Sequence, residues 1–97
     1  MIGEWSVIVV EDDLVVADLE GEAVVMNLDI GHYYGLNKIG ARVLELAKQP
    51  TPVREIVVAL QHQYDVEPER LTRDVLAFLH TMEEKNLIRE KETTLQQ

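Results

Sequence analysis

Few side chains in this sequence have the types and spacing that chemistry requires. The three histidines, His32, His62 and His80, fall in different predicted elements, and no two of them have the four-residue spacing of a helical metal-ligand pair. Ser6 is the single serine, and no Gly-x-Ser-x-Gly or phosphate-loop pattern occurs. Cysteine is absent, which excludes disulfides and thiolate catalysis and fits a reducing cytoplasm. The sequence therefore predicts a cytoplasmic protein that is not an enzyme and that uses no metal and no cofactor.

Charge is distributed unevenly along the chain. The net charge is −9 over 97 residues. Residues 1–37 hold eight acidic residues and no lysine or arginine, whereas residues 38–97 hold ten acidic and nine basic residues. Because binding to nucleic acid requires clustered lysine and arginine to neutralise phosphates, a field of this sign opposes it. Two interpretations of the acidic first third remain open: solubility, and attraction of a basic partner.

Length and composition indicate one domain over residues 1–97. A chain of 97 residues can bury a single modest core but is short for an enzyme with a deep pocket. The hydrophobic content of 46% argues against disorder. No run of 18 apolar residues and no signal-peptide pattern occurs, so we expect a soluble protein that is neither exported nor bound to a membrane.

The first third of the chain has the pattern of an antiparallel sheet. Its β-prone runs occupy residues 5–10, 14–19, 22–28 and 32–36. Hairpin turns are predicted at 20–21 and at 29–31, where Gly31 suits a positive φ. Connections this short force antiparallel pairing, so we expect a sheet of three to four strands over about residues 5–36.

The remainder of the sequence is helical. Helices are predicted over about 38–48, 52–63 and 68–86, and a flexible tail over 90–97. Asn37 is a good N-cap for the first helix, Thr51 caps the second with Pro52 at its first position, and Pro68 begins the third. Strands followed by three helices indicate an α+β domain, and the short connections favour a helix-turn-helix arrangement.

The third predicted helix has an apolar stripe that is widened on one flank. The members of the stripe are Leu71, Val75, Phe78 and Met82. Phe78 is expected at its centre, while Leu76 and Leu79 extend it on one side and polar residues occupy the other. Two interpretations remain open: core packing, or an apolar shelf beside an open sheet edge, which would form a peptide-binding cleft.

Two adjacent tyrosines mark the last predicted strand. If side chains alternate over residues 32–36, Tyr34 and Leu36 share one face and Tyr33 takes the other. We expect Tyr34 and Leu36 to anchor the core. Tyr33 is then available at a cleft or rim, where tyrosine offers a stiff surface with a polar tip.

Two stretches of the sequence resemble a known family. The first, "GHYYGLNKIGARVLEL", carries a Gly-x-Tyr-Tyr-x-Leu-Asn-x-x-Gly pattern. The pattern is formed by Gly31, Tyr33, Tyr34, Leu36, Asn37 and Gly40. The second, "EIVVALQHQYDVEPERLTRDVLAFLHTMEEKNLI", is an amphipathic run. Over about residues 14–89 the chain resembles the PqqD-like family of precursor-peptide recognition domains, in particular the stand-alone versions from lasso-peptide biosynthesis.

The resemblance implies a winged helix-turn-helix-like fold without catalytic activity. Such domains capture the leader segment of a ribosomally made precursor peptide as an added strand, in a cleft between the last strands and the third helix. The implied partners are a separate cysteine protease that removes the leader and a macrolactam-forming cyclase. The additional β-prone run at 5–10 departs from the simplest three-strand pattern and leaves the docking strand open.

The resemblance and the apolar shelf together indicate a peptide-binding surface on the third and fourth strands and the third helix. Its expected members are Val25, Met26, Asn27, Leu28, Asp29, Tyr33, Thr72, Leu76, Leu79, His80 and Glu83. Main-chain pairing would supply affinity, and Leu76 and Leu79 would form one wall of a pocket for side chains.

Three alternatives to this function remain open. One is a PqqD-type peptide chaperone for a radical-enzyme pathway. Another is a winged-helix DNA-binding regulator, whose reader helix would carry Arg70, Arg73 and Lys85, although nearby acidic residues offset these charges. The third is a structural adaptor that binds a folded protein.

Overall fold

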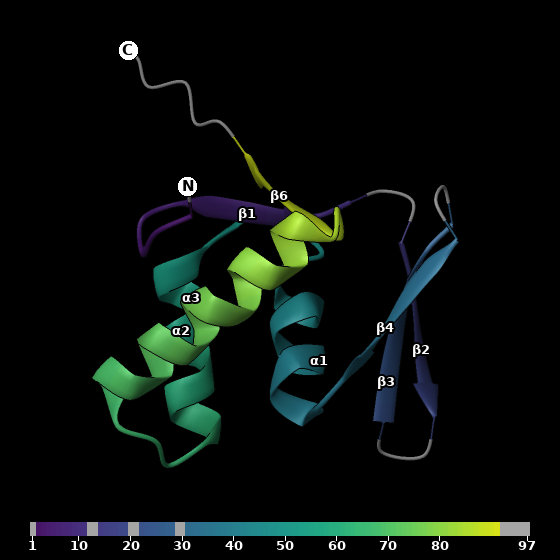
Figure 1. The fold of residues 1–97 in the computed structure, drawn as a ribbon. Helices are drawn as coiled ribbons and strands as arrows, with labels where there is room; N and C mark the ends of the chain where they lie inside the picture. The colour runs from purple at the N-terminus through teal and green to yellow at the C-terminus, as the bar shows by residue number, and fades with distance from the viewer. Residues whose placement is uncertain (1, 12–13, 20–21, 29–30, 92–97) are drawn as a thin grey trace.

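A computed structural model describes residues 2–11, 14–19, 22–28 and 31–91. In chain order its elements are β1 (Val7–Val10), β2 (Leu14–Leu19), β3 (Glu22–Asn27), β4 (His32–Leu36), α1 (Lys38–Leu46), β5 (Thr51–Pro52), α2 (Val53–Gln63), α3 (Pro68–Glu84) and β6 (Ile88–Lys91). In Figure 1 the three helices lie together, β1 and β6 cross one end of them, and β2, β3 and β4 stand to one side. The predicted α+β class is confirmed.

The strands β2, β3 and β4 form an antiparallel sheet, called here the wing sheet, with β3 at its centre. Paired residues form rows across it, and successive rows face opposite sides. One row comprises Val16, Val25 and Tyr34, and the next comprises Val15, Met26 and Tyr33. Val25 is fully buried whereas Tyr33 is 74% exposed, so the first row faces the core and the second faces outward.

The two tyrosines of β4 divide as the alternation predicts. Leu36 is buried and Tyr34 packs against the core cluster, while Tyr33 is exposed. Gly31 has the predicted positive φ, of 71°, and its amide donates to the carbonyl of Asn27 over 2.9 Å. The ladder joins Asn27 to His32, so the connection is residues 28–31, one residue longer than predicted. The predicted turns at 20–21 and 29–30 lie outside the described residues.

A second antiparallel sheet has the order β5-β1-β6. The expectation of one sheet over residues 5–36 is therefore wrong, because β1 pairs with β6, near the end of the chain, and not with the wing sheet. The prediction of a flexible tail over 90–97 is wrong at Glu90 and Lys91, which belong to β6, while residues 92–97 lie outside the described residues. The sequence does not indicate β6, because only Ile88 of its four residues is buried and only pairing with a distant strand defines it. Beside this pairing, Arg89 Nε lies 2.9 Å from Glu11 Oε1.

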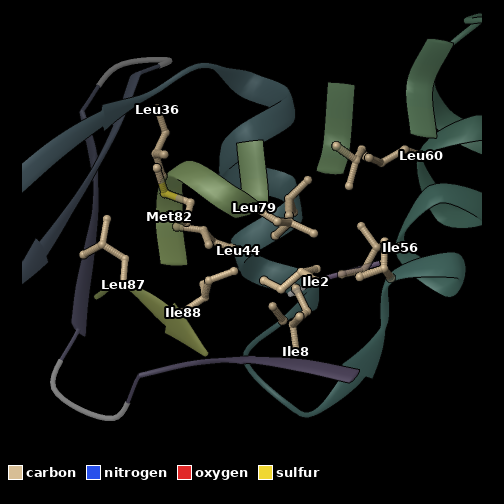
Figure 2. Close-up of a cluster of buried hydrophobic side chains, with 14 of the residues drawn as sticks. Ile2, Ile8, Leu36, Leu44, Ile56, Leu60, Leu79, Met82, Leu87 and Ile88 are labelled. Atoms are coloured by element: carbon tan, nitrogen blue, oxygen red, sulfur yellow. The ribbon is translucent and has the colours of Figure 1, made fainter. Parts of the chain in front are cut away.

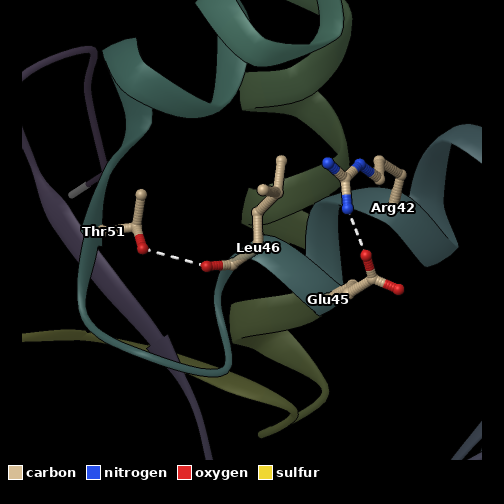
Figure 3. A network of polar contacts seen from close by, with 4 residues as sticks. All are labelled: Arg42, Glu45, Leu46 and Thr51. Carbon is tan, nitrogen blue, oxygen red and sulfur yellow. Dashed lines mark hydrogen bonds and ion pairs between the residues drawn. The ribbon is translucent and has the colours of Figure 1, made fainter. Parts of the chain in front are cut away.

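The first two helices differ in how well their starts were predicted. Asn37 caps α1 as expected, since its Oδ1 accepts from the Gly40 amide over 2.7 Å. The predicted cap of α2 is wrong by one residue: Pro52 is the N-cap and Thr51 pairs with β1. The Thr51 hydroxyl instead donates back toward α1, 2.9 Å from the Leu46 carbonyl oxygen (Figure 3).

The third helix begins at Pro68, as predicted, and ends at Glu84, two residues before the predicted end. Asn86 adopts φ 60° directly after the helix. The Asn86 amide donates to Glu83 and the Leu87 amide to Met82, over 3.0 and 2.9 Å. This paired pattern with a left-handed residue closes the carbonyls of the last turn and directs the chain into β6.

The core lies between the helices, the inner face of the wing sheet and the strands β1 and β6. Leu79 and Met82 of α3 are fully buried in it, together with Leu44 of α1 (Figure 2). Ile2, which precedes the first strand, also belongs to this cluster. The N-terminal segment therefore contributes to the packing of α3. Hydrophobic periodicity could not predict this contact, because Ile2 lies outside any helix or strand.

Candidate peptide-binding site

The two edges of β4 are not equivalent. One edge pairs with β3, and among the described residues the other has no strand partner. A hollow of about 430 Å³ lies at the start of β4. Gly31, Tyr33 and Tyr34 line one side of it, and residues 84–87 line the other. Tyr33 and Tyr34 face opposite sides of the sheet but both line this space, which we call the Tyr34 hollow. It therefore lies at the free edge of β4, opposite the end of α3.

Lys85 closes part of the Tyr34 hollow. Its ammonium nitrogen lies 5.2 Å from the centroid of the Tyr34 ring, a distance suited to a cation–π contact. Nearby, Asn27 Nδ2 donates to the Asn86 carbonyl over 3.1 Å, which ties β3 to the turn after α3. These contacts fix the distance between the wing sheet and the C-terminal end of α3.

A second hollow, of about 620 Å³, lies where β4 leads into α1 and faces the first half of α3. Its apolar lining comprises Ile39, Val43, Val66, Leu71, Val75 and Phe78. The ring of Phe78 lies against Gly40, so close that a Cβ at Gly40 would be 3.0 Å from Phe78 Cε1. We call this space the Phe78 hollow. The Tyr34 hollow adjoins the start of β4 and the last residue of α3, whereas the Phe78 hollow begins at Asn37, directly after β4, and has residues 70–78 of α3 as a wall.

The charges around the Phe78 hollow are mainly negative. Asp65, Glu67 and Asp74 line it, against the single cation Arg70. Arg70 Nε lies 3.8 Å from Asp74 Oδ2, so this cation is already engaged by a carboxylate. An approaching segment therefore meets an apolar floor with an acidic rim.

The structure places the expected residues of β3 away from any free edge. Because β2 and β4 pair with both edges of β3, an added strand cannot pair with Val25, Met26 or Asn27. Val25 is fully buried and Asn27 nearly so, whereas Met26 and Leu28 are exposed. Asp29 lies outside the described residues. Of the expected strand residues, only Tyr33 lines a hollow at the free edge.

The apolar shelf expected on α3 is absent, because Leu79 is fully buried. The buried stripe consists of Leu71, Val75, Leu79 and Met82, and Phe78 is half-buried at its side. The buried stripe keeps the predicted Leu71, Val75 and Met82, and Leu79, about 100° further around the helix, takes the place of Phe78. Periodicity locates an apolar stripe, but which of its residues is central depends on where the neighbouring elements approach.

The remaining expected residues of α3 lie on a different flank from the two hollows. His80 Nε2 lies 3.1 Å from the Ile2 carbonyl oxygen, so this flank faces the N-terminal segment. Phe78 is two residues away and projects in nearly the opposite direction, about 160° around the helix. Thr72, Leu76 and Glu83 are half-buried and line neither hollow. Their role in peptide binding stays a prediction.

The sequence analysis does not identify Phe78 and Lys85 as residues that line the two hollows. It places Phe78 in the core and counts Lys85 only as a charge that neighbouring acidic residues offset. One signal was available: Gly40 stands inside a helix, where glycine costs about 1 kcal/mol relative to alanine. A glycine inside a helix is typical of a position where another group approaches the backbone closely, and here that group is Phe78.

Two further observations concern the described part of the chain. No group of three or more histidine, aspartate or glutamate side chains in it is arranged to hold a metal ion. None of its helices has the length and apolar content needed to cross a membrane.

Comparisons with known proteins agree with this architecture. The profile of the family described as "Coenzyme PQQ synthesis protein D (PqqD)" matches residues 22–88. A comparison with curated proteins found no match. The structure of TbiB1 in complex with the TbiA(beta) leader peptide is similar, with 29% identity and a TM-score of 0.77 over 88% of this chain and 99% of that chain.

A second solved structure has the same fold. It is a lasso peptide synthetase B1 complexed with the leader peptide, with 20% identity and a TM-score of 0.74 over 84% of this chain and 96% of that chain. At this identity the likeness concerns the fold alone. The family match, in contrast, covers more than half of the sequence and includes β3, β4 and all three helices. The chain therefore belongs to the PqqD family.

Proposed function

We propose that this chain binds the leader segment of a ribosomally synthesised precursor peptide as a strand added to the free edge of β4. One observation carries the proposal: among the described residues one edge of β4 is unpaired, with a hollow beside its start and another beyond its end, in a chain 29% identical to TbiB1, which was solved with a leader peptide. In this proposal the functional site is the unpaired edge of β4 and not a set of catalytic side chains.

The geometry supports a division between affinity and selectivity. An exposed strand edge offers unpaired N–H and C=O groups, so an added strand gains main-chain hydrogen bonds whatever its sequence. Its side chains alternate, and those that face the helices would enter the Tyr34 and Phe78 hollows. Both spaces have an aromatic wall, which provides a large contact area at low conformational cost. Apolar leader side chains at matching positions would therefore be selected.

Binding of the leader would serve recruitment. In lasso-peptide maturation, the first candidate pathway, the bound leader is presented to a cysteine protease that removes it, and then to a macrolactam-forming cyclase. The resemblance to stand-alone recognition domains of that pathway supports this role. The side chains of the leader that point away from the helices stay accessible to such partners, as does Tyr33 on the outer face.

The decisive experiment is a titration with the leader peptide encoded beside this gene. Ordering a flexible segment costs several kcal/mol, so we expect a Kd between about nanomolar and micromolar by calorimetry. Hydrogen exchange should slow at His32–Leu36, while β1, which is paired on both edges, serves as the reference that does not change. A scrambled leader is the control. Absence of binding at about 100 μM leader would refute the proposal.

The family description supports a second candidate pathway. Since the matched profile is that of a coenzyme PQQ synthesis protein, the peptide of this second candidate is the precursor of a radical-enzyme pathway. Neighbouring genes separate the two candidates. A small protease with an asparagine-synthetase-like cyclase indicates lasso-peptide maturation, whereas a radical enzyme indicates the other pathway.

A further inference from the structure

We propose that a second groove, along the free edge of β2, binds an extended segment of a partner protein in which acidic and apolar side chains alternate. This site lies on the opposite edge of the wing sheet from β4, so it goes beyond leader binding. Two adjoining hollows of about 490 and 340 Å³ form it, between β2 and α1. They share Val16 and Lys48, and we call them together the β2 groove.

The edge of β2 that faces away from β3 is regular, and Asp18 is the single charged residue of the strand. Among the described residues β2 pairs with β3 alone, over an unbroken ladder of six residues. Its sequence, LVVADL, contains no proline and no lysine, and no bulge interrupts the pairing. Val15 and Val16 face opposite sides of the sheet but are 45% and 39% exposed. Soluble proteins usually blunt such an edge or cover it, so an apolar, regular edge indicates a strand acceptor.

The opposite wall of the groove is basic. Lys38, Arg42 and Lys48 of α1 and the turn after it line the larger hollow, in a protein with net charge −9. Two carboxylates of the groove are already engaged, Glu45 by Arg42 (Figure 3) and Glu11 by Arg89. Among the carboxylates whose side chains the structure describes, which exclude Asp18 and Glu22, none lies within 4.0 Å of the ammonium group of Lys38 or Lys48. These two exposed lysines are therefore available to a ligand with negative charge.

Edge and charge together specify the ligand. A strand added to β2 would continue the rows of the wing sheet, so its alternate side chains would face α1 or the outer surface. Carboxylates are favoured on the side of Lys38 and Lys48. Apolar side chains are favoured on the other, beside Val15 and the outward row that it begins.

A second copy of this chain fits the groove less well. Self-pairing through β2 would place the strand LVVADL in the groove. This strand has one carboxylate, Asp18, and not the alternating carboxylates that would meet Lys38 and Lys48. The charge pattern thus favours a different protein, and self-association is an outcome that the experiment must detect.

The experiment uses a blocked eight-residue peptide of alternating glutamate and valine as the probe. Titrated to about 2 mM at low salt, it should slow hydrogen exchange at Leu14–Leu19 and leave His32–Leu36 unchanged. A peptide of alternating lysine and valine should bind at least about tenfold more weakly, because its charges face the same lysines. Unchanged exchange at β2 with the glutamate peptide would overturn the proposal. Protection of β2 in concentrated protein without peptide would overturn it in favour of a second copy.

Matched variants test the charge argument. The double variant Lys38→Gln and Lys48→Gln should weaken the glutamate peptide about threefold to tenfold, as expected for two exposed ion pairs. The control, Arg73→Gln and Lys91→Gln, removes the same charge from exposed positions outside the groove. If both double variants bound the glutamate peptide equally weakly, the assignment of the binding site to the β2 groove would be wrong. Both variants should bind the leader peptide like the unmodified protein, so failure here is distinguishable from failure of leader binding at β4.

Discussion

The ring of Phe78 in α3 lies directly against Gly40 in the first turn of α1. A Cβ at position 40 would lie 3.0 Å from Phe78 Cε1 and 3.1 Å from Cζ. The Gly40 amide also donates to Asn37 Oδ1, so the same residue holds the N-cap of α1. This contact joins the end of β4, the start of α1 and the middle of α3 at the floor of the Phe78 hollow.

Gly40→Ala should therefore affect leader binding more than stability. Alanine gains about 1 kcal/mol of helix propensity, but its methyl group forces the half-buried Phe78 ring to move. We expect the free energy of unfolding to change by less than about 1 kcal/mol and the leader Kd to rise about threefold to tenfold. The matched control is Gly3→Ala, where nothing lies within 4 Å of the new Cβ. Chemical denaturation and calorimetry measure the two effects, and unchanged leader affinity would show that the ring position does not matter.

Leu79→Ala should mainly lower stability, whereas Phe78→Ala should mainly weaken leader binding. Leu79 is fully buried, so its truncation should lower the free energy of unfolding by about 2–5 kcal/mol while the folded fraction binds leader normally. Phe78 is half-buried at the hollow. Its truncation should cost less than the roughly 3–5 kcal/mol of a fully buried phenylalanine and should weaken leader binding by about 1–3 kcal/mol. Denaturation and titration of the same two proteins measure both effects. If Leu79→Ala weakened leader binding and Phe78→Ala mainly lowered stability, the leader would bind on the Leu79 side of the helix.

Local signals in the sequence predicted the parts of the fold that local chemistry decides. Asn37 and Pro68 begin their helices as expected, because a cap or a fixed φ acts within one turn. The alternation of Tyr33 and Tyr34 follows from the pleat of a single strand. The pairing of β1 with β6 could not be predicted in the same way, since its partners are nearly the whole chain apart.

The same distinction explains the errors at the site. The apolar residues of α3 cover a wide arc, and periodicity alone cannot say which of them is central. The position of Ile2 beneath His80 and of Gly40 beneath Phe78 decides this, and both are tertiary contacts. The free edge also depends on strand order: β3, which contains the expected binding residues Val25, Met26 and Asn27, lies in the middle of the wing sheet.

Asn86→Ala should destabilise the fold at the end of α3. Asn86 has φ 60°, a conformation in which asparagine is tolerated and alanine is strained by about 1 kcal/mol. Asn86→Gly keeps the conformation and should leave the free energy of unfolding within about 0.5 kcal/mol of the original. Urea denaturation of the pair provides the measurement. Equal stabilities would indicate that the turn relaxes and that its φ does not restrain the connection to β6.

The acidic rim of the Phe78 hollow leads to a prediction about rates. A leader with lysine or arginine should be attracted to Asp65 and Glu67, which are exposed, and the effect should appear chiefly in the association rate. Raising salt from about 50 to about 500 mM shortens the Debye length from about 14 to about 4 Å, so association should slow more than dissociation accelerates. Asp65→Asn with Glu67→Gln should reproduce part of this slowing in stopped-flow measurements at low salt.

The control for this charge effect is Glu4→Gln with Glu55→Gln. It removes the same charge near the start of α2, whereas Asp65 and Glu67 follow the end of that helix. Because exposed pairs contribute only about 0–1 kcal/mol each, the apolar hollows should still dominate affinity in both double variants. Steering by the rim requires that the Asp65 and Glu67 variant associate more slowly than the control. Equal rates would mean that the net charge of −9 acts as a whole, and rates insensitive to salt would leave solubility as the role of the acidic residues.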